Sequence, residues 1–238
     1  MKKLIIIPAY NEEKSLLQVI ADIRENAPDY DYVVINDAST DQTKKVCEDN
    51  QIHFLDLASN LGIGGAVQTG YQYALYEGYD IAVQLDGDGQ HMATSLREME
   101  RELKTEENGN GTADLVIGSR FIDKEGFQST GLRRIGIGFL GWLIRCVTGN
   151  KVTDPSSGLR MGNNEVIKIF ANAYPWDYPE PESLVTIAKR NLSIREVPVV
   201  MRERQGGKSS IGNPLKAVYY MIKVSCGILI EAAGRRNA

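Results

Sequence analysis

Residues 81–91 read Ile81-Ala-Val-Gln-Leu-Asp-Gly-Asp-Gly-Gln-His91, an apolar run that ends in two aspartates, each followed by glycine. Because side chains alternate along an extended segment, Asp86 and Asp88 point to the same side. Two neighbouring carboxylates on the same side of a strand repel each other unless a cation lies between them. Their oxygens suit Mg²⁺ or Mn²⁺, whose remaining positions are commonly filled by substrate phosphates. The alternative is a polar turn after a buried strand, since Asp-Gly is a common turn dipeptide.

The composition is that of a globular protein. The chain has 238 residues, of which 42% are hydrophobic, enough for one large α/β domain or a domain with an appendage. A net charge of −4 argues against general binding to nucleic acids. Cys47, Cys146 and Cys226 lie far apart in the sequence, which indicates a reducing compartment and buried thiols. The apolar run 4–7 is too short for a signal peptide, so we expect a first strand there.

Further apolar runs predict strands at 32–35, 52–57, 80–85 and 115–117. A helix is predicted after each of the first four strands, with Asn11 and Asp41 as caps of the first two. Strands that alternate with helices imply a mostly parallel sheet. Ligands bind beyond the carboxyl ends of such strands. Polar residues that follow the strands should therefore meet at one edge, which favours the cation site over the simple turn; they are Tyr10, Asn11, Glu12, Asn36, Asp37, Asn60, Asp86 and Asp88.

The glycine-rich segment 60–70 opens the third predicted helix. A dinucleotide-binding loop that started at Gly62 would need glycine at position 67, where the chain has Val67, and the lysine of a Walker loop is also missing. Two interpretations stay open: a helix start that binds phosphate, and a glycine-rich turn without a ligand.

Motifs in the first half of the chain read Pro8-Ala-Tyr-Asn-Glu12, Asn36-Asp-Ala-Ser-Thr-Asp41, Asn60-Leu-Gly62 and Asp86-Gly-Asp-Gly-Gln-His91. Together they resemble the inverting family 2 glycosyltransferases. Later motifs are similar to those of polyprenyl-phosphate and dolichyl-phosphate sugar synthases; they are Gly118-Ser-Arg120, Asp154-Pro-Ser-Ser-Gly-Leu-Arg160, Arg195-Glu-Val-Pro198 and Gly206-Gly-Lys-Ser-Ser210. The motifs follow the family's order over nearly the whole chain. The resemblance implies an α/β protein with the GT-A fold, a mostly parallel central sheet flanked by helices.

The resemblance also implies roles for single residues. The nucleotide base and ribose would be lined by Pro8, Ala9, Tyr10, Glu12 and Asp37, and the nucleotide-sugar site would include Asn60, Gly62 and Asp86. Asn36 stands where the family often has an aspartate, so the base contacts are open at this point. Asp86 and Asp88 match the metal ligands, with Gln90 beside them. Arg202, Lys208 and Ser209 match a basic loop that closes over phosphates.

The chemistry of such a transfer needs positive charge. A nucleotide-diphosphate leaving group gains negative charge, which a metal stabilises as a Lewis acid. An acceptor phosphate is already nucleophilic, and arginine forks fit its oxygens. Arg120, Arg160, Arg202 and Lys208 rank first because each lies inside a motif, ahead of Arg133, Arg134 and Arg204; for each, plain surface charge is the alternative.

Five further polar residues are open to functional or structural interpretations. Asp154 orients the acceptor, or acts as a base for a hydroxyl acceptor, unless it only forms an Asp-Pro turn. His91 either belongs to the metal site or caps the next helix, and His53 is read as structural. Glu180 and Glu182 are either acceptor-side carboxylates or charges in the first turn of a helix that runs from Pro179 to about residue 191.

Two segments in the second half are amphipathic. In 132–147, Ile135, Phe139, Trp142, Leu143 and Cys146 share one helical face, and arginines lie on another. This pattern is typical of a helix at a membrane surface, although packing on the sheet is the alternative. The segment 217–233 is apolar but is interrupted by Lys223 and is too short to span a bilayer. It would lie on the membrane, dock a small membrane protein, or pack against the core or a second copy of the chain.

These observations predict a catalytic domain at 1–211, including the interfacial segment 132–148, and a C-terminal amphipathic helix at 212–238. We expect a Mg²⁺- or Mn²⁺-dependent glycosyltransferase that moves a sugar from a nucleotide diphosphate to a polyprenyl phosphate. A UDP-sugar is favoured over GDP-mannose as donor. The expected location is cytoplasmic, peripheral on the inner face of the cell membrane. The alternatives are transfer to a hydroxyl of a glycan or lipid-linked saccharide, and a module that binds nucleotide sugar without turnover.

Overall fold

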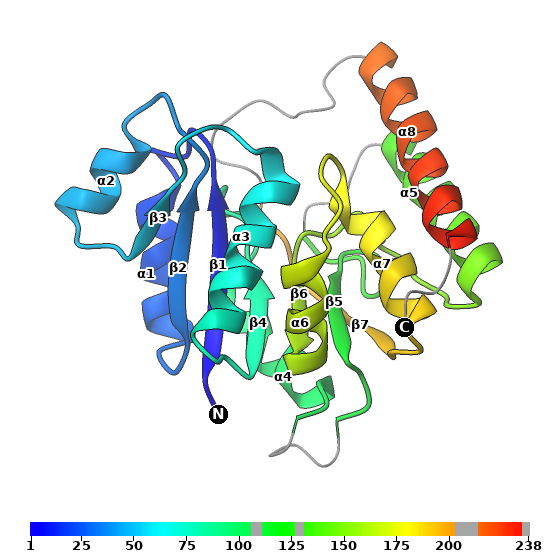
Figure 1. The fold of residues 1–238 in the computed structure, drawn as a ribbon, viewed down its shortest axis with the longest axis horizontal. Helices are drawn as coiled ribbons and strands as arrows, with labels where there is room; N and C mark the ends of the chain where they lie inside the picture. Colours follow the sequence, from blue (N-terminus) through cyan, green and yellow to red (C-terminus); the bar gives the residue numbers. More distant parts are fainter. Residues whose placement is uncertain (106–110, 127–130, 203–213, 235–238) are drawn as a thin grey trace.

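The protein is described by a computed structural model over residues 1–105, 111–126, 131–202 and 214–234. In this part of the chain, seven strands form one sheet in the order β3-β2-β1-β4-β6-β5-β7. Figure 1 shows helices on both faces of this sheet, as predicted. The strands are β1 Lys3–Ala9, β2 Asp31–Asn36, β3 Phe54–Asp56, β4 Ile81–Gln84, β5 Leu115–Ser119, β6 Arg160–Asn163 and β7 Ile194–Pro198. The helices are α1 Leu16–Asn26, α2 Thr43–Asp49, α3 Gly62–Tyr76, α4 Leu96–Glu102, α5 Gly131–Thr148, α6 Asn164–Asn172, α7 Pro179–Lys189 and α8 Pro214–Ala233.

The sheet is parallel except for one strand. β1 pairs in parallel with β2 and β4, β2 with β3, and β5 with β7, whereas β6 runs antiparallel to both β4 and β5. The prediction of a mostly parallel α/β sheet is therefore confirmed. Its consequence is that the carboxyl ends of β1, β2, β4 and β5 share one edge of the sheet, to which β6 contributes its first residue, Arg160.

Successive apolar residues of a strand point to opposite faces of the sheet. Leu4 and Ile6 of β1 pack with residues of α3, α6 and α7, whereas Ile5 and Ile7 pack with residues of α1 and α4. All four side chains are fully buried, because helices cover both faces of β1. This is the burial expected of a central parallel strand.

The predicted elements are present, with ends that differ by a few residues. Asn11 is not a helix cap: α1 begins at Leu16, and Asn11 adopts a φ of 59° in the preceding loop. The strands β6 and β7 and the helix α6 were not predicted from the sequence. β6 has the sequence Arg-Met-Gly-Asn, which is too short and too mixed in polarity to show a strand pattern.

The amphipathic segments α5 and α8 lie side by side at one end of the molecule (Figure 1), where Gly136 of α5 faces Met221 of α8. α8 also packs on α7, and its residues Val224 and Ile228 are fully buried. In the described ranges, no helix is both long and apolar enough to cross a membrane. The expectation of buried thiols holds only for Cys47, since Cys146 and Cys226 are exposed on these two helices.

Candidate active site

The candidate site lies along the sheet edge where the parallel strands end. Tyr10 follows β1, Asp37 follows β2, Asp86 follows β4 and Arg120 follows β5. The topology therefore brings together residues that are up to about half the chain apart in sequence.

At the β1–β2 end of this edge, Asp37 holds the start of α3. Its Oδ1 accepts a hydrogen bond from the backbone N–H of Leu61 at 2.7 Å, and its backbone oxygen accepts one from the side chain of Asn60 at 3.1 Å. The Asn60 Oδ1 in turn accepts from the N–H of Gly62 at 3.2 Å. Burial raises the pKa of Asp37, and the backbone donors at residues 61 and 62 oppose this shift. The motifs that contain Asp37 and Asn60 thus form one structural unit.

The loops after β1 and β2 are bound to each other. Asn11 Oδ1 accepts from the backbone N–H of Thr40 at 2.8 Å, and the N–H of Glu12 donates to Thr43 Oγ1 at 2.8 Å. Tyr10, next to these contacts, is 49% exposed, whereas Pro8 and Ala9 are buried at the end of β1. An exposed tyrosine on a braced loop can stack on a planar ligand.

Asn36, the departure from the family's aspartate, has a local explanation. Its Nδ2 donates to Asp56 Oδ1 at 2.6 Å, and Lys44 pairs with the other oxygen of Asp56 at 2.7 Å. An aspartate at position 36 would set two carboxylates against each other across β2 and β3. Asparagine supplies a donor instead.

The glycines at the start of α3 serve turning and close packing. Gly62 has a φ of 75°, which favours glycine. A β-carbon on Gly64 would overlap with the backbone oxygens of Pro175 and Trp176, and one on Gly70 would overlap with Ile6 of β1. Packing accounts for Gly64 and Gly70, so these two glycines do not by themselves indicate a phosphate loop.

The acidic cluster is built by the turn after β4. Asp86 Oδ1 accepts from Gln84 Nε2 at 3.0 Å, and Asp88 Oδ1 accepts from the backbone N–H of Gln90 at 3.0 Å. Asp88 is 8% exposed and Asp86 is half-buried. Two carboxylates and one carboxamide oxygen are hard donors of the kind that Mg²⁺ and Mn²⁺ prefer. Within the described residues, no group of three or more His, Cys, Asp and Glu side chains forms a complete metal shell, so a substrate would have to supply further ligands.

His91 lies beside this cluster and does not cap a helix. Its Nε2 is 3.7 Å from Asp86 Oδ2, and the following 3-10 turn, Ala93–Ser95, has no side-chain cap. Burial lowers the pKa of His91 to about 4; Asp88 opposes the shift and Arg120 adds to it. The imidazole is therefore neutral at pH 7.

Arg120 and Asp154 form a buried ion pair. Arg120 Nε and Nη2 donate to the two carboxylate oxygens of Asp154, each at 2.6 Å, and Nη2 also donates to Ser156 Oγ at 2.9 Å. The backbone N–H groups of Thr153 and Asp154 donate to Glu196 of β7, both at 2.8 Å. Asp154 is fully buried. Both of its oxygens accept from Arg120, and its predicted roles, orienting the acceptor or acting as a base for a hydroxyl acceptor, stay predictions.

Arg160 differs from expectation. It is fully buried, and its guanidinium donates to the backbone oxygens of Ser157 and Pro155, at 2.8 and 2.9 Å, and to Ser183 Oγ at 2.7 Å. The two hydrogen bonds to backbone oxygens hold the loop between Asp154 and β6 in place. This geometry does not present Arg160 to a phosphate.

The acidic pair at the start of α7 divides between two environments. Glu180 is half-buried near Asp86, and burial raises its pKa to about 7; the charge of Arg160 opposes this shift and that of Asp86 adds to it. Glu182 faces α8, where a β-carbon on Gly227 would overlap with it. Only Glu180 lies on the active-site side.

The remaining basic candidates lie around Arg120 and Gln90. The side chain of Arg133 in α5 is exposed as a whole. Partial burial of its guanidinium and, second, the nearby charge of Arg120 lower its pKa. Arg202 is exposed, and its backbone N–H donates to the backbone oxygen of Gln90 at 3.0 Å. Arg204, Lys208 and Ser209 lie outside the described residues.

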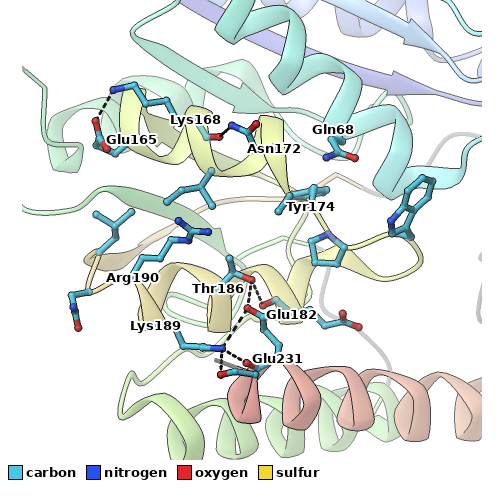
Figure 2. A pocket seen from close by; sticks show the side chains of 17 residues that line it. Gln68, Glu165, Lys168, Asn172, Tyr174, Glu182, Thr186, Lys189, Arg190 and Glu231 are labelled. Atoms are coloured by element: carbon cyan, nitrogen blue, oxygen red, sulfur yellow. Dashed lines mark hydrogen bonds and ion pairs between the residues drawn. The ribbon is translucent and has the colours of Figure 1, made fainter. Parts of the chain in front are cut away.

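A second hollow lies away from this edge. A groove of about 1320 Å³ lies between α6 and α7, bordered by α3 and the end of α8. Figure 2 shows the side chains that line it. Its lysines are engaged: Lys168 pairs with Glu165 at 2.8 Å, and Lys189 donates to the backbone oxygens of Glu231 and Gly234. Among the described candidate residues, Glu182 lines this groove, whereas Asp86, Asp88, Arg120 and Asp154 do not.

The parallel sheet with one antiparallel strand and the acidic turn after β4 define a class of protein, the GT-A glycosyltransferases. Residues 4–170 match the model of the family "Glycosyl transferase family 2", and the chain belongs to this family. It is therefore a glycosyltransferase, as the sequence motifs predicted.

Similar proteins come from bacteria and archaea. The chain is 31% identical over 223 residues to the undecaprenyl-phosphate mannosyltransferase of Micrococcus luteus, covering 89% of this chain and 88% of the relative. It is 29% identical over 218 residues to the UDP-N-acetylglucosamine–dolichyl-phosphate N-acetylglucosaminyltransferase of Methanococcus voltae, covering 82% and 83%. A crystal structure of glucosyl-3-phosphoglycerate synthase from Mycobacterium tuberculosis, in complex with Mn²⁺, UDP and product, superposes with a TM-score of 0.71. At 20% identity over 98% of this chain and 80% of that one, it shows a shared fold.

Proposed function

We propose that this enzyme transfers a sugar from a nucleotide-diphosphate sugar to a polyprenyl phosphate. The observation that carries the proposal is the Arg120–Asp154 pair. Asp154 is the carboxylate that the sequence motifs place best to serve as a base. Both of its oxygens accept hydrogen bonds from the guanidinium of Arg120. An acceptor phosphate is already anionic and needs no general base, so a site whose best-placed carboxylate is engaged by Arg120 is compatible with it. The similar polyprenyl- and dolichyl-phosphate transferases support this acceptor class.

On the donor side, Asp86 and Asp88, with Gln90, would hold a divalent cation. Bound there, the cation would supply Lewis-acid stabilisation for the departing diphosphate. The chain's own residues do the positioning: the exposed Tyr10 would stack on the base, and Asp37 fixes the start of α3 beside it. UDP is favoured as the nucleotide because the name of the M. voltae relative contains a UDP-sugar.

The proposed acceptor lipid requires access to a membrane, and α5 and α8 offer a suitable surface. The exposed apolar side chains Ile135, Phe139 and Trp142 form a stripe on α5, as predicted, although Leu143 is buried. With 100° between successive residues, this stripe lies next to the contact between α5 and α8. The exposed residues Val218, Ile222 and Leu229 of α8 also lie next to that contact. We call the joined surface the apolar patch; it consists of Ile135, Phe139, Trp142, Val218, Ile222 and Leu229. Arg134 and Arg145 flank it on α5, which suits anionic headgroups. We propose that the patch docks the enzyme on the inner face of the cell membrane.

Transfer to a hydroxyl is a second candidate, and Glu180 is the observation that favours it. A carboxylate whose burial raises its pKa to about 7 is suited to general-base catalysis near neutral pH. Its place at the start of α7, on the side of Asp86, is within the same site.

The substitution Asp88→Asn tests the donor half of the proposal. We expect kcat to fall by about 10²–10³-fold because the cation loses a charged ligand. Transfer would be measured with labelled nucleotide sugar and membrane lipid extract. The matched control Asp49→Asn, an exposed position at the end of α2, should keep full activity. Full activity of the Asp88→Asn enzyme with divalent ions chelated would refute a metal-dependent transfer.

A further inference from the structure

We propose that Gln84 is a positioning residue that fixes the orientation of the Asp86 carboxylate for the divalent cation. Gln84 is fully buried at the end of β4, in a run of apolar residues. A buried carboxamide is costly unless its hydrogen bonds are made. This proposal rests on the proposed cation site and adds to it a residue that would not itself touch the cation.

Gln84 connects Asp86 to the core behind the sheet. Its Nε2 donates to Asp86 Oδ1 at 3.0 Å, and its Oε1 lies 3.5 Å from the hydroxyl of Tyr174. Tyr174 is itself buried and packs edge-on against Phe170, at 4.9 Å between ring centroids. The amide therefore has one end fixed near a rigid aromatic cluster, and its other end directs the carboxylate.

The opposite side of Asp86 is closed by backbone. A β-carbon on Gly158 would overlap with both carboxylate oxygens, so the Asp86 side chain rests against the Cα of that residue. His91 Nε2 lies 3.7 Å from Oδ2. Between Gln84, Gly158 and His91, the carboxylate has little freedom to rotate.

The same support reaches the nucleotide side. Tyr174 belongs to the segment between α6 and α7, and the backbone oxygen of Trp176 in that segment accepts from Gly64 N–H of α3 at 3.0 Å. In Figure 2, Tyr174 lies between α6 and the start of α3, where Gln68 also points into the groove. One segment thus braces both the start of α3 and the metal-side aspartate.

A ligand carboxylate that is already oriented binds its cation with a smaller entropic cost, and loss of such support commonly lowers metal affinity or activity by about 10–100-fold. Gln84→Leu removes the donor and keeps a similar volume. We expect it to weaken Mn²⁺-dependent nucleotide binding by about 10–100-fold. Binding of the nucleotide without metal should stay the same, and saturating Mn²⁺ should restore most of kcat.

The experiment compares wild type, Gln84→Leu, Gln68→Leu and Asp88→Asn. Mn²⁺ affinity is measured by electron paramagnetic resonance, and affinity for UDP or GDP by calorimetry with and without Mn²⁺. Gln68 is a matched control, because its carboxamide also donates a hydrogen bond, to the backbone oxygen of Ala171 at 3.4 Å, but outside the site. Wild-type Mn²⁺ affinity in Gln84→Leu, while Asp88→Asn has lost it, would overturn the inference alone. An equal loss of nucleotide binding with and without metal would also overturn it, since that result means general disruption. If neither wild type nor Asp88→Asn binds Mn²⁺, the proposed cation site itself fails.

Gly158→Ala is a second, independent variant. The added methyl should push Asp86 from its position and weaken Mn²⁺ binding as Gln84→Leu does, with metal-free nucleotide binding intact. Unchanged Mn²⁺ affinity in Gly158→Ala would contradict the idea that a fixed Asp86 orientation matters.

Discussion

At the β1–β4 end of the active-site edge, the carboxylates of Asp86 and Asp88 accept hydrogen bonds from neutral amides, those of the Gln84 side chain and the Gln90 backbone. At the β5–β7 end, the carboxylate of Asp154 is fully occupied by Arg120. One end thus holds its carboxylates with neutral hydrogen-bond donors, and the other holds its carboxylate with a guanidinium of opposite charge. The comparison predicts that removing a carboxylate charge destabilises the protein more at the second end.

The largest expected effect on stability follows from Asp154→Asn. Breaking a buried ion pair leaves Arg120 without its counter-charge, which should lower the free energy of unfolding by on the order of 3 kcal/mol. Asp88→Asn should lower it less, because asparagine keeps an oxygen that can accept from the backbone N–H of Gln90. Urea denaturation of both variants without metal measures the contrast. Equal destabilisation by the two substitutions would remove the distinction between the ends.

Glu180 predicts a smaller, pH-dependent effect. Its pKa in the folded protein is about 7, above the ordinary 4.5, so the unfolded chain releases this proton at lower pH. Stability from this group is present below pH 4.5 and is lost as the pH rises to about 7. Glu180→Gln should therefore become more stable than wild type by about 1–3 kcal/mol above pH 7, and by little at pH 4.5. Thermal unfolding without metal at both pH values is the measurement. The exposed Glu48→Gln is the control, and a difference independent of pH would contradict the shift.

The apolar patch predicts the smallest change, a shift in tryptophan fluorescence. The chain has two tryptophans: Trp142, 59% exposed on the patch, and Trp176, 65% exposed between α6 and α7. With vesicles that contain anionic lipid, the Trp176→Phe variant should show a blue shift from Trp142. The Trp142→Phe variant, which retains only Trp176, should shift much less. A shift from Trp176 alone would place the membrane contact elsewhere.

The β1–β4 part of the candidate site was more predictable from the sequence than the β5–β7 part. Runs such as 4–7 and 81–85 are apolar because helices cover both faces of β1 and β4, and the acidic turn follows directly. The antiparallel β6 could not be predicted, because its four residues, Arg-Met-Gly-Asn, show no alternating apolar pattern. The motifs located Arg120 and Asp154, but only the structure shows that they bind each other.

Two supporting residues were visible in the sequence without being assigned a role. Glu196 lies inside a quoted motif, and its contacts with the backbone of Thr153 and Asp154 are between β7 and a distant loop. Gln84 is a polar residue in an apolar strand, a signal that a buried hydrogen bond is needed there. Their partners are set by tertiary contacts, which local patterns do not contain.

The most direct test of the proposed reaction identifies the product. Wild-type enzyme would be incubated with Mn²⁺, a labelled UDP- or GDP-sugar and polyprenyl phosphate, and the organic extract treated with mild acid. A label that enters the lipid phase and is released as free sugar by mild acid would show a glycosyl phosphate, as we predict. A labelled product that resists mild acid would be an ordinary glycoside, and it would contradict a phosphate acceptor.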